Sequence, residues 1–183
     1  MSNPSPATAY ADERRAWDSF AKAYFDGNAH GVPGANTQIV PAAEFLWGVA
    51  PKETLDPNTV EGSYLPKPEI HMQIADGRPR ATTRGKRGGA TRFRTEQRAA
   101  TTFIRCALQG GGPGNAAAIL AEKIASLFAA LVDGGAARTH LQPYGLHRAK
   151  ITRGPQQVNT AAQAAITFSL TLQWELRMEG NAV

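Results

Sequence analysis

Two stretches of the chain carry apolar residues at the spacing of an amphipathic helix. Between Ala9 and Asp26, and again between Ala116 and Val132, apolar side chains recur every three or four positions. They are Trp17, Phe20, Ala21 and Tyr24 in the first stretch and Leu120, Ile124, Leu127, Phe128 and Leu131 in the second. Glycine follows each stretch, as is typical of a helix end. The pattern therefore predicts two helices that each bury one face.

Strict alternation of apolar and polar residues from Ala164 to Leu176 predicts the best-defined strand of the chain. Further extended segments are expected at 37–40, 44–49, 69–84, 91–108 and 145–152. The polar face of the final strand carries Thr167, Ser169, Thr171 and Gln173, all uncharged. Because strands and helices do not alternate regularly, we predict an α+β fold. In it, a mainly antiparallel sheet packs its apolar face against the two helices.

The segments outside these elements differ in character. Residues 1–8 are small and polar, so we expect a disordered N-terminus, followed by a single domain over residues 9–183. Residues 27–68 contain six prolines and are expected to form a long loop. No secretion signal precedes the first helix, and no apolar run reaches the roughly 18 residues of a membrane span. With Cys106 as the lone cysteine, these features indicate a protein made in a reducing cytoplasm.

Positive charge is concentrated in one segment of the chain. The net charge is +5, but residues 78–105 hold nine basic residues and one acid, so the remainder sums to −3. A hairpin that turns at 85–89 would place Arg80 opposite Arg94. Like charges placed opposite each other destabilise a strand pair. We therefore predict an extended basic hairpin arm over residues 76–98 that becomes ordered only when an acidic partner covers it.

The clustered cations of this arm are the predicted partner-contacting residues. They are Arg78, Arg80, Arg84, Lys86, Arg87, Arg92, Arg94 and Arg98. An acidic protein surface, on a second copy of the chain or on a neighbouring protein, is the favoured partner. Nucleic acid phosphate is one alternative, although Phe93 is the only aromatic residue among these cations, which is unfavourable for base stacking. A solvated charged loop is the other alternative.

Residues with catalytic or ligating potential are present but isolated along the sequence. The histidines form no metal-binding pair, and the glycine-rich run 110–114 lacks the lysine of a phosphate-binding loop. His71 is expected to be structural, and Cys106 to be a buried, unreactive thiol. Asp12 and Glu13 are interpreted as first-turn acids that interact with the helix dipole. We therefore expect no metal, no cofactor and no enzymatic activity.

The order of these features resembles the tail terminator proteins of long-tailed bacteriophages. The resemblance begins with a first helix ending near Asp26-Gly27 and runs through most of the chain. Its later features are the proline-flanked strand 68–74, the entry Arg92-Phe93-Arg94-Thr95 into a long strand, the Gly-rich link to a helix containing 121–128, and Gln157-Val158-Asn159 before the final strand. Residues 27–68 have no counterpart in this resemblance.

The resemblance implies a small α/β subunit that closes into a six-fold ring. Such a ring caps the head-proximal end of the tail tube, stops its polymerisation and presents a surface for joining the head. The implied partners are further copies of the chain, the tail tube protein and a head-proximal neck or connector protein. DNA would pass through the lumen without sequence-specific binding. The implied location is the virion, with no membrane involved. Two alternatives remain: another neck or tail-completion protein, such as a head–tail connector subunit, and a DNA-binding module that uses the basic arm.

Overall fold

The computed structural model describes residues 5, 7–25, 43–48, 68–75, 93–107, 115–158 and 165–179. In chain order its elements are α1 (Ala9–Phe25), β1 (Glu44–Trp47), β2 (Glu69–Ala75), β3 (Phe93–Ala107), α2 (Asn115–Asp133), α3 (Arg138–Leu141), the 3-10 helix η1 (Gln142–Tyr144), β4 (Leu146–Val158) and β5 (Ala165–Glu179). The predicted α+β class is therefore confirmed, as are both predicted long helices.

One five-stranded sheet, in the order β1-β2-β3-β5-β4, forms the frame of the molecule. Only β1 and β2 run parallel; every other neighbouring pair is antiparallel. The pairing of Glu69 with Arg105 through Ala75 with Ala99 has the register predicted for the basic hairpin. The predicted pairing of Arg80 with Arg94 continues that register but lies outside the described residues.

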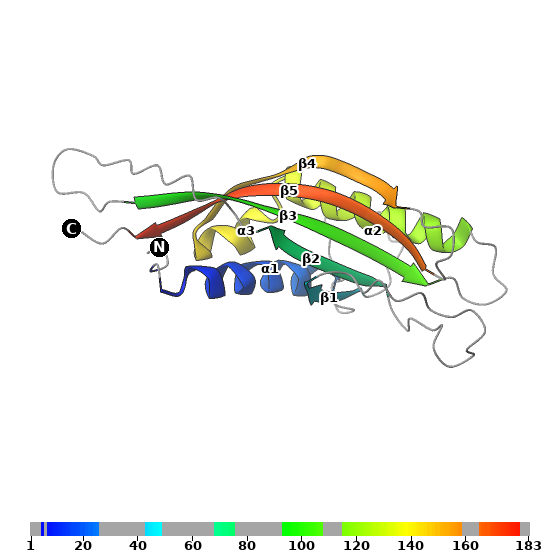
Figure 1. Ribbon diagram of the computed structural model, residues 1–183, viewed down its shortest axis with the longest axis horizontal. Helices are drawn as coiled ribbons and strands as arrows, with labels where there is room; N and C mark the ends of the chain where they lie inside the picture. The colour runs from blue at the N-terminus through cyan, green and yellow to red at the C-terminus, as the bar shows by residue number, and fades with distance from the viewer. Residues whose placement is uncertain are drawn as a thin grey trace.

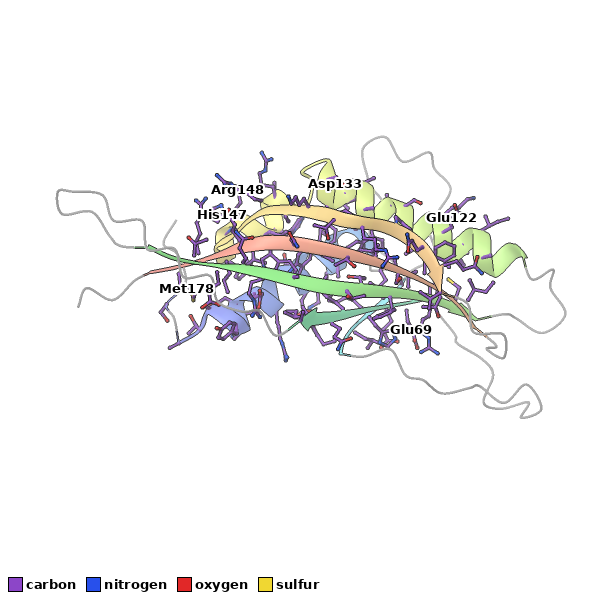
Figure 2. The ribbon with its side chains drawn as sticks, turned by 45° about the horizontal axis from the view of Figure 1, so that its top comes forward. Glu69, Glu122, Asp133, His147, Arg148 and Met178 are labelled. Atoms are coloured by element: carbon purple, nitrogen blue, oxygen red, sulfur yellow. The ribbon has the colours of Figure 1, made fainter. Side chains whose placement is uncertain are left out.

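Helices α1 and α2 cover the same face of this sheet (Figure 1), and Figure 2 shows them behind the strands. The even-numbered residues of β3 and β5 face them, since Ile104 pairs with Phe168 and Ala100 pairs with Leu172, all four buried. Side chains from every helix except η1 join the same buried cluster. The expectation that the apolar face of the final strand packs on helices is confirmed. No helix of the described part is long and apolar enough to cross a membrane.

Several boundaries differ from the predictions. The short helices α3 and η1 were not expected, because four- and three-residue elements carry too little periodicity to be recognised. Strand β4 continues to Val158 beyond the predicted end at Thr152, although it contains Gly154 and Pro155. Proline is tolerated there because β4 is an edge strand. The predicted disordered segment 1–8 is described only in part, and the strand 37–40, most of the loop 27–68 and residues 76–92 of the arm lie outside the described residues.

The two longest strands extend beyond their neighbours. Strands β3 and β5 have 15 residues each, or about 50 Å at about 3.4 Å per residue. Pairing with β2 stops at Ala99, and pairing with β4 stops at Leu176. Among the described strands, the remaining ends, Phe93–Thr95 and Arg177–Glu179, pair with each other and project together in Figure 1, and the Arg177 N–H also donates to the Gly145 carbonyl at 2.8 Å. This two-stranded ribbon is the point at which the basic arm joins the sheet.

Candidate functional site

The predicted partner-contacting cations divide into those the structure describes and those it does not. Arg78, Arg80, Arg84, Lys86, Arg87 and Arg92 lie outside the described residues. The backbone of Arg94 lies in β3, opposite Met178, and its side chain is outside the described part. Arg98 alone has a described side chain. Their predicted role at a partner surface therefore stays a prediction.

Arg98 lies inside the fold and makes its ion pair within the same chain. Its Nε donates to Glu13 Oε1 at 3.0 Å and its Nη2 donates to Glu13 Oε2 at 2.9 Å, a two-point contact. The Arg98 side chain is 12% exposed and that of Glu13 only 1%. Arg98 therefore joins β3 to α1 within the chain, and its predicted place at the partner surface stays a prediction. The repulsion expected among the clustered arginines is relieved here by an acid from outside the segment.

Glu13 has a second donor, and its interpretation as a first-turn acid is wrong, because α1 begins at Ala9 and Asp12 is the acid of its first turn. Trp174 Nε1 donates to Glu13 Oε1 at 2.7 Å, so the carboxylate connects α1, β3 and β5. Sequence reasoning treated Glu13 as a first-turn acid at the helix dipole, because a buried role cannot be read from helix position alone. We refer to Tyr10, Glu13, Glu96, Arg98 and Trp174 as the Glu13 cluster.

Tyr10 and Glu96 complete the Glu13 cluster on its solvent side. Tyr10 Oη donates to Glu96 Oε2 at 3.2 Å, and the Arg98 guanidinium lies over the Tyr10 ring at 5.0 Å from its centre. Burial lowers the pKa of Arg98, but the hydrogen bonds and charge of Glu13, assisted by Tyr10 and Glu96, raise it, and the net direction is upward. Arg98 thus stays charged at the base of the arm.

A second ion-pair cluster lies at the opposite end of the sheet, where Figure 2 labels Glu69. Glu69 Oε2 accepts from Arg105 Nη1 at 3.1 Å and lies 2.8 Å from His71 Nε2. Arg105 and His71 are both buried. His71 is therefore structural, as expected, and Arg105 is a second basic residue of the 78–105 segment that is neutralised within the chain.

The sheet face opposite the helices is uncovered by any helix or strand of the described chain. We call the side chains that β2, β3 and β5 place on it the open face. Most of its central residues are polar or small and uncharged, and one is aromatic: Gln73, Gln97, Ala99, Thr101, Ser169, Thr171 and Gln173, with Phe103 opposite Ser169. Its charged residues balance, with Glu69 beside Arg105 at one end and Glu175 beside Arg177 at the other. The edge strand β4 adds Lys150 and Arg153 on the same side of the sheet, opposite Gln173 and Thr171. The predicted neutral character of the final strand thus extends across three strands.

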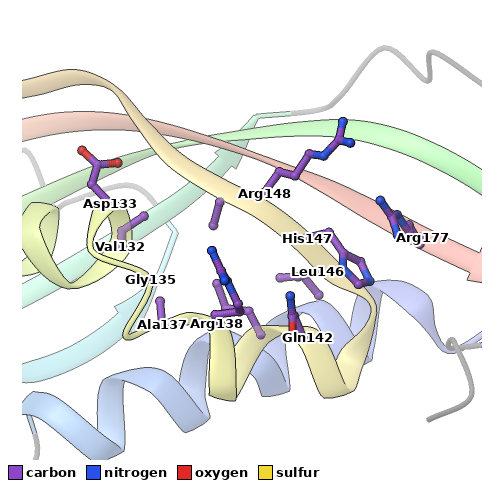
Figure 3. A pocket seen from close by; sticks show the side chains of 12 residues that line it. Val132, Asp133, Gly135, Ala137, Arg138, Gln142, Leu146, His147, Arg148 and Arg177 are labelled. Atoms are coloured by element: carbon purple, nitrogen blue, oxygen red, sulfur yellow. The ribbon is translucent and has the colours of Figure 1, made fainter.

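A cavity of about 270 Å³ opens at the rim of the sheet, beside the first residues of β4. Its walls come from the end of α2, the α3–η1 turn and parts of β4 and β5, and its basic side chains are Arg138, His147, Arg148 and Arg177. Figure 3 shows Arg138 and Gln142 rising from the helical turn toward β4. Sequence reasoning missed this rim cavity because its residues are scattered over 132–149 and 177 and form no motif.

Cys106 is buried on the helix-facing side of β3, as expected. Burial raises the pKa of its thiol to about 12, so almost no thiolate exists at neutral pH. We expect the native protein to show no reaction with an aromatic disulfide reagent at pH 8, and one thiol per chain to react in denaturant. Prompt labelling of the native protein would contradict this expectation.

The described residues contain no group of three or more histidine, cysteine or acidic side chains placed to hold a metal ion. A scan against protein-family models finds no matching family, and a search of curated proteins finds no matching relative. The site must therefore be interpreted from its own chemistry, and the expectation of a non-enzymatic role stays a prediction.

Proposed function

We propose that this chain is a structural subunit that closes into a homo-oligomeric ring, in the manner of a phage tail terminator. The observation that carries this proposal is the sheet itself: helices cover one face, whereas the open face is broad and its charges on β2, β3 and β5 balance. Monomeric α+β proteins also leave one sheet face to solvent. The unusual features here are the 15-residue strands and the projecting ribbon attached to a strongly basic segment.

The composition of the open face favours a water-exposed lumen surface over a subunit interface. The cores of permanent protein–protein interfaces are enriched in apolar and aromatic residues, and the centre of the open face is mostly threonine, serine and glutamine. A nucleic-acid-binding face would carry rows of surplus cations, whereas the charges of β2, β3 and β5 are paired and the surplus cations on this side, Lys150 and Arg153, lie on the edge strand β4. A neutral polar surface suits the lumen of a ring through which DNA passes without being held.

Lateral contacts between subunits would then come from the sheet edges and the ribbon. An edge strand presents unpaired backbone groups that another chain can bind. Strand β1 is only four residues long, and β4 is interrupted by three register shifts, so both edges are poor templates for open-ended strand addition. The projecting ribbon and its basic arm remain as the stronger candidates for contacting a neighbour.

Mass measurement on the purified full chain tests this proposal. We expect light scattering after gel filtration to give a multiple of the 19.5 kDa chain mass, and electron microscopy to show closed rings, six-fold if the tail terminator resemblance holds. A strictly monomeric protein, both alone and when mixed with tail tube subunits, would refute the proposal.

Affinity capture with the purified chain tests which proteins contact the proposed ring. We propose that the tail tube protein and a head-proximal neck protein are the partners and that the protein resides in the virion. Retention of portal-side proteins without tube protein would instead indicate a head–tail connector. Tight binding to duplex DNA that weakens steeply with salt, and that is lost when Arg84, Lys86 and Arg87 are replaced, would indicate a DNA-binding module.

A further inference from the structure

The rim cavity has the form of a site for a small charged group. Its volume, about 270 Å³, is slightly below the roughly 300–1,000 Å³ typical of small-molecule sites. Leu141 and Leu146 are buried beside it and supply an apolar floor. Gln142 adds an amide that can donate or accept. An occupant would therefore contact aliphatic groups on one side and polar groups on the other.

Cations outnumber acids in the lining of the rim cavity. Arg138, Arg148 and Arg177 oppose a single aspartate, Asp133, whose Oδ1 is already bonded to the backbone N–H of Ile151 at 2.7 Å. Glu175 lies behind the lining and is shared by Arg148 at 2.9 Å and Arg177 at 3.4 Å. Arg138 forms no ion pair within the described chain. When Asp133 and Glu175 are counted against the three arginines, one positive charge remains. Arg138 carries it, because it is the arginine without an ion pair among the described residues.

The backbone at Arg148 is strained where β4 borders this site, and in Figure 3 the Arg148 side chain extends from β4 away from Arg138, toward its ion-pair partner Glu175. Arg148 has φ 53°, a left-handed conformation that residues other than glycine rarely adopt. It lies in a register shift, since His147 pairs with Glu175 and Lys150 pairs with Gln173, so Arg148 and Ala149 together oppose Trp174. Such bulges re-aim side chains and are common beside functional sites, and strain of about 1 kcal/mol or more persists only where the surroundings enforce it.

We propose that the rim cavity binds a carboxylate side chain presented by an acidic protein segment. Arg138 provides the unpaired guanidinium, and the Arg148–Glu175–Arg177 group provides a second cationic wall. A guanidinium can hold a carboxylate through two parallel hydrogen bonds, and the apolar floor accommodates the methylene groups of glutamate. The proposal concerns the single chain and does not depend on ring formation.

Protein carboxylate fits this cavity better than the phosphates of nucleic acid. A duplex is held by rows of cations that follow its backbone over an open surface. The rim cavity is a concave recess between a strand and a helical turn, with apolar walls that a phosphate would not use. Nucleic acid is therefore treated as the competing outcome in the test.

The first test measures binding of a fluorescent tetraglutamate peptide to the full chain by anisotropy, against a tetraglutamine peptide of equal length. We expect saturable binding of the glutamate peptide only, weakened about tenfold by Arg138→Gln. Arg148→Gly should also weaken binding while leaving the thermal midpoint unchanged, because glycine adopts the left-handed backbone without strain. Arg153→Gln removes an exposed charge of the same strand outside the cavity and should change the affinity by less than about twofold.

Three results would overturn the proposal. They are equal binding of both peptides, equal weakening by Arg153→Gln and Arg138→Gln, and duplex DNA that binds more tightly than the peptide with the same dependence on Arg138. The last of these would assign the cavity to nucleic acid. The mass of each variant, measured in parallel, separates these outcomes from failure of ring formation.

Titration of His147 supplies a second readout. Burial lowers the pKa of His147, Arg177 and Arg148 lower it further, and Glu175 partly offsets them; Arg138 and Asp133 also line the cavity. A bound anion favours the protonated ring, so binding of the glutamate peptide should strengthen between pH 7.5 and 5.5. His147→Gln should remove that slope while keeping binding at pH 7.5. If the pH dependence of peptide binding were the same in His147→Gln, the anion would not bind beside the His147 ring.

Discussion

Replacement of Glu13 by glutamine is expected to lower the free energy of unfolding by about 3 kcal/mol, because removing one partner of a buried ion pair leaves the other uncompensated. Glutamine retains an oxygen that can accept from Trp174 but loses the charge that pairs with Arg98. Glu96 and Tyr10 lie near Arg98 and offset part of the loss, which places the effect at the lower end of the usual range for buried pairs. For a chain of this size the thermal midpoint should fall by about 6–12 °C.

Asp12→Asn is the matched control for this prediction. Asp12 lies one residue earlier on α1 and pairs with Arg15 at 3.2 Å, but the Arg15 side chain is 70% exposed. Such exposed pairs contribute at most about 1 kcal/mol. If Glu13→Gln unfolded at the same urea concentration as Asp12→Asn, the Glu13 cluster would not be a structural link. The double variant Glu13→Leu with Arg98→Met should recover most of the lost stability, since no unpaired charge remains.

The Glu13 cluster also bears on how the basic arm is presented to a neighbour. Arg98 lies on β3 five residues after its first residue, Phe93, where the arm enters the sheet. Arg98 donates hydrogen bonds to the Glu13 carboxylate of α1, and Trp174, the residue paired with Arg98 on β5, donates to the same carboxylate. The base of the ribbon is therefore held against the helix layer. The ribbon can therefore project from a fixed base even in a single chain. The proposed contact with a neighbour concerns the residues beyond this base.

Much of the fold followed from sequence periodicity, because burial of one face imposes a repeat on every long element. The predicted helix at 9–26 is observed at Ala9–Phe25, and the final strand departs from its prediction by extending three residues further, to Glu179. The register of β2 against β3 was also predictable, since a turn predicted at 85–89 fixes which residues would face each other, and the observed pairs agree with it. The position of β1 beside β2 was not, because a four-residue parallel strand depends on contacts distant in sequence.

The candidate site was much less accessible to sequence reasoning. The clustered charge of residues 78–105 was visible, but the identity of the cations neutralised inside the chain was not. Arg98 and Arg105 find their acids, Glu13 and Glu69, 85 and 36 residues away. The rim cavity could not be predicted for the same reason, because Arg177 of β5 is distant in sequence from the other lining residues, which belong to the α2–β4 region. Periodicity reports which face is buried, and only the folded chain shows which polar groups meet there.

Trp17→Ala is expected to cost about 3–5 kcal/mol, the range for removing a large aromatic residue from a core. Trp17 is fully buried on α1 and joins three elements of the core: its ring contacts Phe20 on the same helix, stacks on Phe128 of α2 and meets the edge of Trp174 of β5. Against a typical total stability of about 5–15 kcal/mol, this loss threatens the folded state itself. Urea denaturation followed by circular dichroism at 222 nm measures it without depending on tryptophan fluorescence.

Two further tryptophan variants define the origin of that loss. Trp17→Phe should cost only about 1 kcal/mol, because it keeps an aromatic ring and removes a buried indole N–H that has no hydrogen-bond partner among the described residues. Trp47→Ala should cost less than Trp17→Ala, since Trp47 is half-buried on the edge strand β1 and is held mainly by Asp18 and Arg14. Equal losses for Trp47→Ala and Trp17→Ala would mean that the helix layer is not joined to the sheet through Trp17. The base of the ribbon would then depend on the Glu13 cluster alone for its attachment to α1.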